Sequence, residues 1–156
     1  MGRDHPGIYV PPPLLYAIPF GLGIVLHRTV GGDAFPEAWT APARAAGVAF
    51  LAAAVTLALT AEAKFLRAGT SPLPMRPATA LLKDGPYRFT RNPMYVALAV
   101  FYAGATLVVG YAWPFAFLPV ALLAVDRYVI PREERYLDRT FGAPYRQYRE
   151  SVRRWL

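Results

Sequence analysis

The sequence predicts an all-α integral membrane protein, a single membrane domain over residues 1–156 with about four transmembrane helices and a cytoplasmic C-terminal helical segment. Hydrophobic residues make up 55% of the chain and charged residues only 17%, a balance too apolar for an ordinary soluble domain. The apolar residues also gather in stretches near the roughly 20 residues that a helix needs to cross hydrocarbon. These predicted spans are residues 12–27, 43–61, 92–110 and 112–130.

The first predicted span, 12–27, contains Pro19, Gly21 and Gly23. Membrane helices tolerate such residues where neighbouring helices satisfy the freed backbone groups. We expect this span to remain in the mature protein, because no basic run precedes it and no small-residue cleavage site follows it. The second span, 43–61, is rich in alanine, which favours close contact with another helix.

The third and fourth spans are separated by only a few uncharged residues and are therefore predicted to form a tight helical hairpin. Asn92 and Pro93 suit the start of the third span. Asparagine is a favoured N-cap, and the backbone N–H that proline lacks would have no hydrogen-bond partner in the first turn of a helix. Two polar segments flank this hairpin, the loop 68–92 and the tail 131–156. A short connection between them means that both can lie on one side of the membrane and meet.

Orientation follows from the lysine and arginine residues, which collect in the loop 68–92 and the tail 131–156. The connection between the first two spans instead carries Asp33 and Glu37. Cytoplasmic segments are enriched in basic residues. The N-terminus, the loop and the tail are therefore predicted to be cytoplasmic, and the membrane to be the cytoplasmic membrane of a prokaryote.

Proline and glycine predict an irregular loop over 68–92, with a short turn of helix near 78–83. The tail is expected to begin as a helix, or with a kink, at Pro131 and to break at Gly142 and Pro144. A last amphipathic piece is expected to lie in the membrane interface with its rings at headgroup level. Its apolar residues are Tyr145, Tyr148, Val152 and Trp155.

Composition also excludes several classes of site. The chain has no cysteine, which rules out disulfides, thiolate metal sites and cysteine nucleophiles. With only His5 and His27 to supply imidazole, no zinc or haem site built on histidines is expected, and no metal-binding residue is predicted, although composition leaves a site built on carboxylates alone open. The net charge of +7 is attributed to basic residues flanking membrane spans rather than to a nucleic-acid partner.

Two polar clusters could carry chemistry, one around Arg91 and Asn92 and one around Glu133 and Glu134. Each has a simpler interpretation. The first cluster can be the start of a helix that is anchored to lipid headgroups, and the second can be an acidic first turn that the helix dipole favours. If the clusters face each other, they form a pocket of mixed charge beside the bilayer. Such a pocket suits a zwitterionic ligand.

The sequence Gly85-Pro-Tyr-Arg-Phe-Thr-Arg-Asn-Pro-Met-Tyr95 is followed by an apolar hairpin, Glu133-Glu-Arg-Tyr-Leu137 and Phe141-Gly-Ala-Pro-Tyr145-Arg-Gln-Tyr148. This order resembles the isoprenylcysteine carboxyl methyltransferases and related phospholipid methyltransferases, over residues 79–154. The resemblance implies S-adenosylmethionine as cofactor, without a Rossmann domain, and Gly-x-Gly-x-x-Gly is indeed missing. The implied cofactor-binding residues are Thr79, Ala80, Leu81, Leu82, Tyr87, Arg91, Asn92, Pro93, Met94, Tyr95 and Glu133.

The resemblance gives Glu133 the role of holding the ammonium of the methionyl group, and makes Glu134 the second acid of the pair. Glu134 or a tyrosine is the candidate base if the methyl acceptor is an amine. In the isoprenylcysteine enzymes a substrate-linked arginine precedes the first glutamate by four residues, but here that position is Val129. Arg132 or Arg127 is the candidate replacement, and Arg132 joins Glu134 as a predicted catalytic residue.

The expected acceptor is lipophilic, either isoprenylcysteine-carboxylate-like or phospholipid-like, and enters from the membrane lipids while the cofactor enters from the cytoplasm. Methyl transfer from a sulfonium is an in-line displacement that depends mainly on positioning. Three alternatives stay open: a small-thiol or quinone-like methyltransferase, a nicotinamide-dependent membrane reductase, and a non-enzymatic scaffold. The sequence also leaves open whether Asp126 forms a salt bridge or shapes the pocket.

Overall fold

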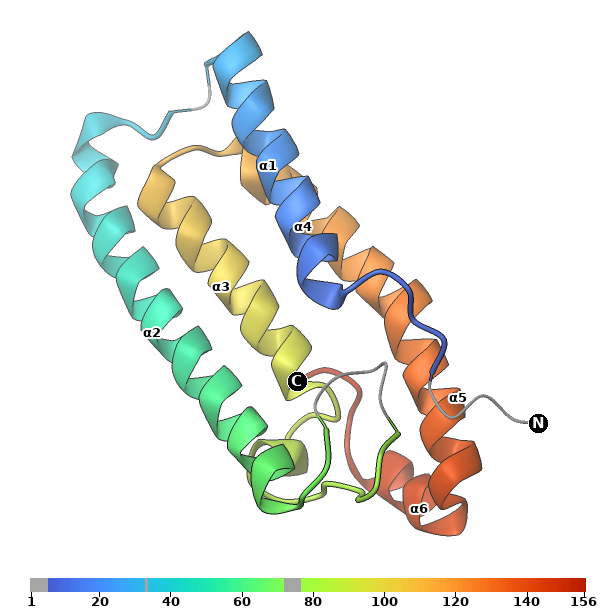
Figure 1. Ribbon diagram of the computed structural model, residues 1–156. Helices are drawn as coiled ribbons and strands as arrows, with labels where there is room; N and C mark the ends of the chain where they lie inside the picture. The colour runs from blue at the N-terminus through green and yellow to red at the C-terminus, as the bar shows by residue number, and fades with distance from the viewer. Residues whose placement is uncertain (1–5, 33, 72–76) are drawn as a thin grey trace.

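The computed structural model describes residues 6–32, 34–71 and 77–156; His5, Asp33 and part of the predicted loop lie outside them. It is an elongated bundle of helices (Figure 1), and no strand occurs in the described ranges, so the all-α prediction is confirmed. The helices are α1 Pro12–Val30, α2 Glu37–Arg67, α3 Pro93–Val109, α4 Trp113–Ala124, α5 Ile130–Phe141 and α6 Ala143–Ser151, with a 3-10 turn at Gly85–Arg88 and a π turn at Val125–Val129.

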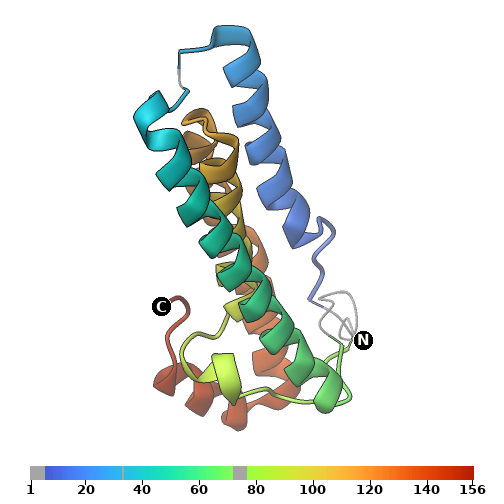
Figure 2. The same ribbon diagram turned by 90° about the vertical axis from the view of Figure 1, so that its left-hand side faces the viewer.

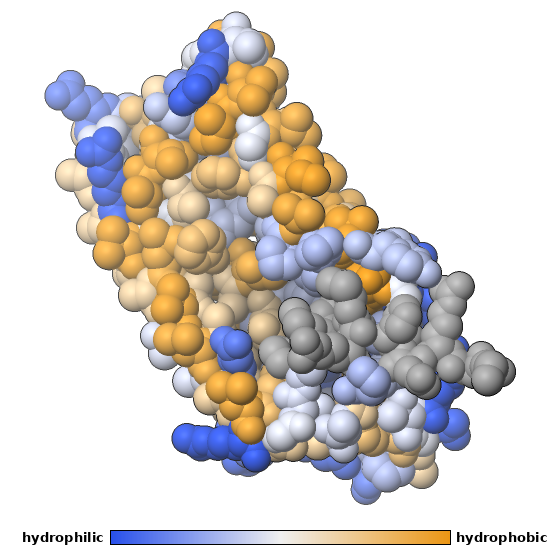
Figure 3. All heavy atoms as spheres, in the orientation of Figure 1, coloured by the Kyte–Doolittle hydropathy of each residue, from blue (hydrophilic) through white to orange (hydrophobic). Residues whose placement is uncertain are grey.

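Among the residues that the structure describes, three helices are long and apolar enough to cross a membrane: α1, α2 and the continuous helix Trp113–Phe141 that joins α4, the π turn and α5. The helix α3 is also apolar but has 17 residues. Large apolar side chains on these helices face outward, among them Ile18, Leu59 and Leu123. Figure 3 shows hydrophobic residues over the length of the bundle and hydrophilic ones toward its two ends, as expected for a surface that meets lipid.

The helices α2 and α3 pack closely because two glycines face each other. A Cβ atom on Gly47 would lie 2.8 Å from the carbonyl oxygen of Gly104, and one on Gly104 would lie 2.9 Å from the carbonyl oxygen of Gly47. Small residues let helix backbones approach in this way. The second span does contact another helix closely, as expected, but the contact is made at Gly47: Ala54 is buried, whereas Ala49, Ala52 and Ala53 are exposed.

The helix α1 packs against α4, where Gly23 leaves no room for a side chain beside Pro114. The segment before α1 also belongs to the core, since Ile8 is buried in the cluster that contains Val125 and Ile130. The helices α1 and α4 thus form one pair of the bundle and α2 and α3 the other (Figure 1).

The tail does not begin a new helix at Pro131. The chain instead passes from α4 through the π turn into α5, and the wider turn accommodates a proline that cannot donate to the preceding turn. The predicted break is confirmed at Gly142, which has φ +57°. The predicted headgroup position of the last piece is wrong: Tyr145 and Tyr148 are only 2% and 6% exposed and pack inside the protein.

The predicted helical turn near 78–83 is wrong as well. There the amide of Ala78 donates to the hydroxyl of Tyr136, and the amide of Thr79 donates to Oγ1 of Thr70. These side-chain acceptors replace the carbonyls of a helix, so the segment stays irregular. The turn forms later, at Gly85–Arg88, and lies with α6 at the same end of the bundle (Figure 2).

Candidate active site

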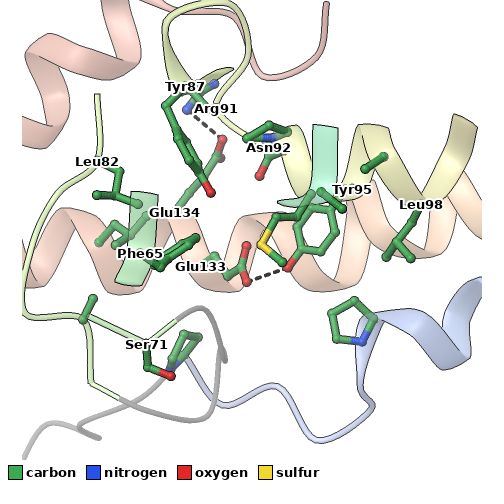
Figure 4. A pocket seen from close by; sticks show the side chains of 18 of the residues that line it. Phe65, Ser71, Leu82, Tyr87, Arg91, Asn92, Tyr95, Leu98, Glu133 and Glu134 are labelled. Carbon is green, nitrogen blue, oxygen red and sulfur yellow. Dashed lines mark hydrogen bonds and ion pairs between the residues drawn. The ribbon is translucent and has the colours of Figure 1, made fainter. Parts of the chain in front are cut away.

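A cavity of about 460 Å³ lies where the 3-10 turn and the start of α3 meet α5 and α6 (Figure 4). The two polar clusters that the sequence singled out therefore come together. The lining side chains also come from α2 and from the chain just before α1. They include Pro12, Ala54, Ala58, Phe65, Ala80, Leu81, Leu82, Tyr87, Arg91, Asn92, Pro93, Met94, Tyr95, Leu98, Phe101, Glu133, Glu134, Tyr136, Leu137, Tyr145 and Tyr148.

Glu133 projects from α5 into the middle of the cavity (Figure 4). The hydroxyl of Tyr95 donates a 2.6 Å hydrogen bond to its Oε1, and no other side chain in the described ranges is hydrogen-bonded to this carboxylate. One carboxylate oxygen thus remains available. A half-buried carboxylate with a free oxygen is suited to bind a cationic group of a ligand.

Glu134 is engaged differently, because both its oxygens accept hydrogen bonds from arginines. Nη1 of Arg91 donates to Oε1 over 2.8 Å. Arg154 adds a two-point contact, from Nε to Oε1 over 3.1 Å and from Nη2 to Oε2 over 2.7 Å. A carboxylate held by two guanidinium groups is fixed in place. Glu134 is therefore better placed to orient Arg91 than to accept a proton from a substrate.

Arg91 lines the cavity and keeps one unused donor. Its side chain is only 12% exposed, and its Nε is buried without a hydrogen-bond partner in the part of the chain that the structure describes. Leaving a buried donor unpaired costs about 1–3 kcal/mol, more for a charged group. The guanidinium of Arg91 also places a positive charge beside the cavity. Arg91 and Glu133 together thus offer a donor and an acceptor of opposite charge.

An aromatic wall lines the part of the cavity that contains Glu133 and Arg91, which we call the polar end (Figure 4). Phe65 of α2 meets the Tyr87 ring edge-on at 5.8 Å between centroids, and the hydroxyl of Tyr148 donates to the carbonyl of Tyr87 over 2.7 Å. Burial raises the pKa values of Tyr87 and Tyr148, so both phenols are neutral at physiological pH. Neutral aromatic rings of this kind suit a flat heterocyclic ligand.

Away from the polar end, the lining becomes apolar and follows α2 and α3. We call this part, formed by Ala54, Val55, Ala58, Leu98 and Phe101, the apolar arm. Val55 and Phe101 are also 46% and 48% exposed. The apolar arm therefore extends from the polar end toward the surface that meets lipid.

Eleven of the predicted site residues line the cavity, namely Ala80, Leu81, Leu82, Tyr87, Arg91, Asn92, Pro93, Met94, Tyr95, Glu133 and Glu134. Thr79 does not, since its hydroxyl donates to the carbonyl of Gly69 outside it. Arg132 is also not among the lining residues. Its guanidinium donates to the carbonyl of Tyr128 and lies 3.9 Å from the centre of that ring.

Sequence reasoning missed several lining residues, which are Phe65, Ala78, Tyr136 and Leu137. The spacing of Tyr145 and Tyr148 did indicate a shared helix face, but the face packs on the cavity and not on lipid. For Phe65 and Tyr136 the sequence offers no signal beyond their proximity to a polar cluster. Arg154 was read only as one of many basic residues in the tail.

Comparison with known proteins identifies the family of the chain. The model of the family described as Phospholipid methyltransferase matches residues 42–144, and so includes most of α2, beyond the region where sequence motifs alone gave the resemblance. An uncharacterized protein of Haemophilus influenzae is 36% identical over 63 residues, which are 40% of this chain and the whole of that protein. No solved structure matches. The chain belongs to the phospholipid methyltransferase family, and with its long apolar helices it is an integral membrane methyltransferase.

Proposed function

We propose that the protein transfers a methyl group from S-adenosylmethionine to a lipophilic acceptor. The observation that carries this proposal is one cavity in which Glu133 and Arg91, of opposite charge, stand at the end of the apolar arm. Its volume of about 460 Å³ lies within the range of small-molecule sites, about 300–1,000 Å³. Family membership favours this chemistry over a nicotinamide-dependent reductase or a scaffold.

The residues fit the cofactor. Its methionyl group carries an ammonium and a carboxylate, which match the free oxygen of Glu133 and the positive charge of Arg91. Its adenine matches the wall formed by Phe65 and Tyr87, with Leu82 beside them. When bound, the cofactor supplies an electrophilic methyl group on a sulfonium.

The protein's part in the reaction is to position the acceptor and exclude water. A thiolate or carboxylate acceptor needs no base, whereas an amine must lose a proton. The double pairing of Glu134 with Arg91 and Arg154 supports a positioning role for Glu134.

The apolar arm supports entry of the acceptor from the membrane. A lipid chain between α2 and α3 would bury its surface against Ala58, Leu98 and Phe101, gaining about 0.8 kcal/mol for each buried CH₂ group. The reactive end would then reach Glu133. The proposed partners are accordingly membrane lipids and a lipophilic acceptor of isoprenylcysteine-carboxylate-like or phospholipid-like chemistry, and not nucleic acid.

We further propose that α3 crosses the membrane as a fourth span. Its 17 residues extend about 25 Å, slightly less than the hydrocarbon thickness of about 30 Å. It runs along the longer α2 in the bundle (Figure 1). The proposed cytoplasmic side is the cavity end, where Lys64, Arg67, Lys83 and Arg88 lie.

The test is isothermal titration calorimetry of the detergent-purified protein with S-adenosylmethionine, with its demethylated product and with a nicotinamide cofactor. We expect saturable binding of the first two ligands only. Nicotinamide binding alone would instead support a reductase, and the absence of all binding would overturn the proposal. Lipid, prenylcysteine, small-thiol and quinone acceptors would then be compared by transfer of a radiolabelled methyl group.

A further inference from the structure

We infer that Arg154 is a positioning residue of this site, acting through Glu134 on Arg91. This inference rests on the proposed function, because it concerns the affinity for the cofactor. Arg154 lies in a short segment after α6, residues 153–155, which we call the strap. Arg154 is not among the cavity-lining residues, so its effect must pass through the residues that it holds.

The backbone of the strap is bound to the loop that leads into α3. The amide of Arg91 donates to the carbonyl of Arg153 over 2.9 Å. The carbonyl of Arg154 accepts from both Oγ1 of Thr90 and Nδ2 of Asn92, each over 2.9 Å. The backbone of the strap thus accepts hydrogen bonds from two cavity residues, Arg91 and Asn92.

The side chain of Arg154 joins two acidic residues of the helix that carries Glu133. It makes the two-point contact with Glu134, and its Nη1 lies 3.3 Å from Oδ1 of Asp126. Asp126 also lies 3.5 Å from Arg127. The open question about Asp126 is thereby answered: it is part of an ion-pair network, and it does not line the cavity.

Trp155 anchors the strap independently of Arg154. Its indole N–H donates to Oδ1 of Asp126 over 3.0 Å, and its ring packs against the core cluster that includes Val125 and Ile130. The strap therefore keeps several attachments when the guanidinium alone is removed. A change at Arg154 should alter the site without detaching this segment.

Removing the guanidinium leaves Glu134 with Arg91 as its only described cation. The carboxylate can then rotate, and Arg91 loses the fixed partner that holds its guanidinium beside the cavity. The ligand must then bear the cost of ordering Arg91. We expect Arg154→Ala to weaken binding of the demethylated cofactor at least about tenfold. Arg154→Lys should recover part of this loss, because lysine cannot make the two-point contact.

The matched control is Arg153→Ala, which removes the same charge from the neighbouring residue. The side chain of Arg153 is exposed, and the contact described for this residue is made by its backbone carbonyl. We expect unchanged affinity for this variant. Calorimetry with the demethylated cofactor on wild type, Arg153→Ala, Arg154→Ala and Arg154→Lys makes the comparison.

A second readout tests the strap without any cofactor. In a Trp39→Phe, Trp113→Phe background, Trp155 is the remaining tryptophan, and acrylamide quenching reports its accessibility. We expect Arg154→Ala to leave the quenching nearly unchanged while affinity falls. Increased quenching would assign the loss to detachment of the strap and overturn the role of the guanidinium. If Arg154→Ala does not fold, Arg154→Lys and Arg154→Gln decide the question by the same two measurements.

The outcomes separate the two proposals. If the wild type does not bind the cofactor, the proposed function fails and this inference fails with it. If the wild type binds and Arg154→Ala binds equally well, only the positioning role of Arg154 is overturned.

Discussion

The hydroxyl of Tyr95 and the carboxylate of Glu133 lie 2.6 Å apart, joining the first turn of α3 to the first turn of α5. The bond occupies one oxygen of Glu133 and fixes the direction of the other. Tyr95 itself is only 8% exposed, so the pair is held inside the protein. The position of the free Glu133 oxygen in the cavity therefore depends on this hydrogen bond.

Replacing Glu133 by glutamine should weaken S-adenosylmethionine binding by at least about tenfold, since the ammonium of the ligand loses a charged partner. The Tyr95 contact can persist, because the amide oxygen still accepts. We therefore expect a normal unfolding temperature together with reduced affinity by calorimetry. Glu150→Gln, at an exposed site in α6, is the control of equal charge. Unchanged affinity of Glu133→Gln would remove Glu133 from the binding site.

Filling the apolar arm should affect the acceptor and not the cofactor. Ala58 lines the cavity away from the charged residues, so Ala58→Phe should raise the KM for a long-chain acceptor by at least about tenfold, by occupying space that the chain needs. The Kd of S-adenosylmethionine should stay within about twofold of wild type. The control is Ala53→Phe, on an exposed part of the same helix. Equal effects of the two variants would contradict the assignment of the arm.

The crossing of α2 and α3 should not tolerate even a methyl group. In Gly104→Ala the new Cβ would approach the Gly47 backbone to 2.9 Å, and separating the helices should cost about 1–3 kcal/mol. Thermal unfolding in detergent should show a lower midpoint. Gly21→Ala is the matched control, because nothing lies within 4 Å of the new Cβ atom, and alanine favours the helix by about 0.5–1 kcal/mol.

Alkaline pH should destabilise the protein through its buried phenols. Burial raises the pKa of Tyr148, so the folded state retains a proton that the unfolded state releases above about pH 10. Its contribution to stability is therefore complete below that pH and decreases as pH rises. Between pH 9 and 11, approximate limits set by the ordinary tyrosine pKa, Tyr148→Phe should lose stability less steeply than wild type, by about one proton. Parallel curves would place Tyr148 in contact with solvent.

Much of the fold follows from composition and spacing. Apolar stretches of membrane-spanning length gave the helices, and the short connection at 110–112 gave the hairpin that brings Asn92 near Glu133. The pattern of a single helix does not say which polar or aromatic groups become buried. Tyr145 and Tyr148 have the spacing of an interfacial helix, yet the chain turns at Gly142 and places them against Tyr87.

The two acidic residues of the site illustrate the same limit. Adjacent glutamates at a helix start are chemically alike in sequence, and only the folded structure gives them different partners. The contacts of Arg154 could not be predicted either, because they depend on the path of the chain after α6. Likewise, Arg132 has the residue type expected of a catalytic group, but its place beside Tyr128 follows from helix geometry.

The π turn at Val125–Val129 determines the rotation of α5 about its own axis, and with it the direction in which Glu133 and Glu134 point. A wider turn holds one residue more than an ordinary one, and one residue corresponds to about 100° of rotation around a helix. If the same residues continued as a regular α-helix, Glu133 and Glu134 would be rotated away from Tyr95 and Arg91, whereas deleting a single residue from this segment would remove the wider turn and keep both glutamates in register. The direction of the two acidic side chains at one end of the molecule is thus set by an irregularity within the continuous helix Trp113–Phe141.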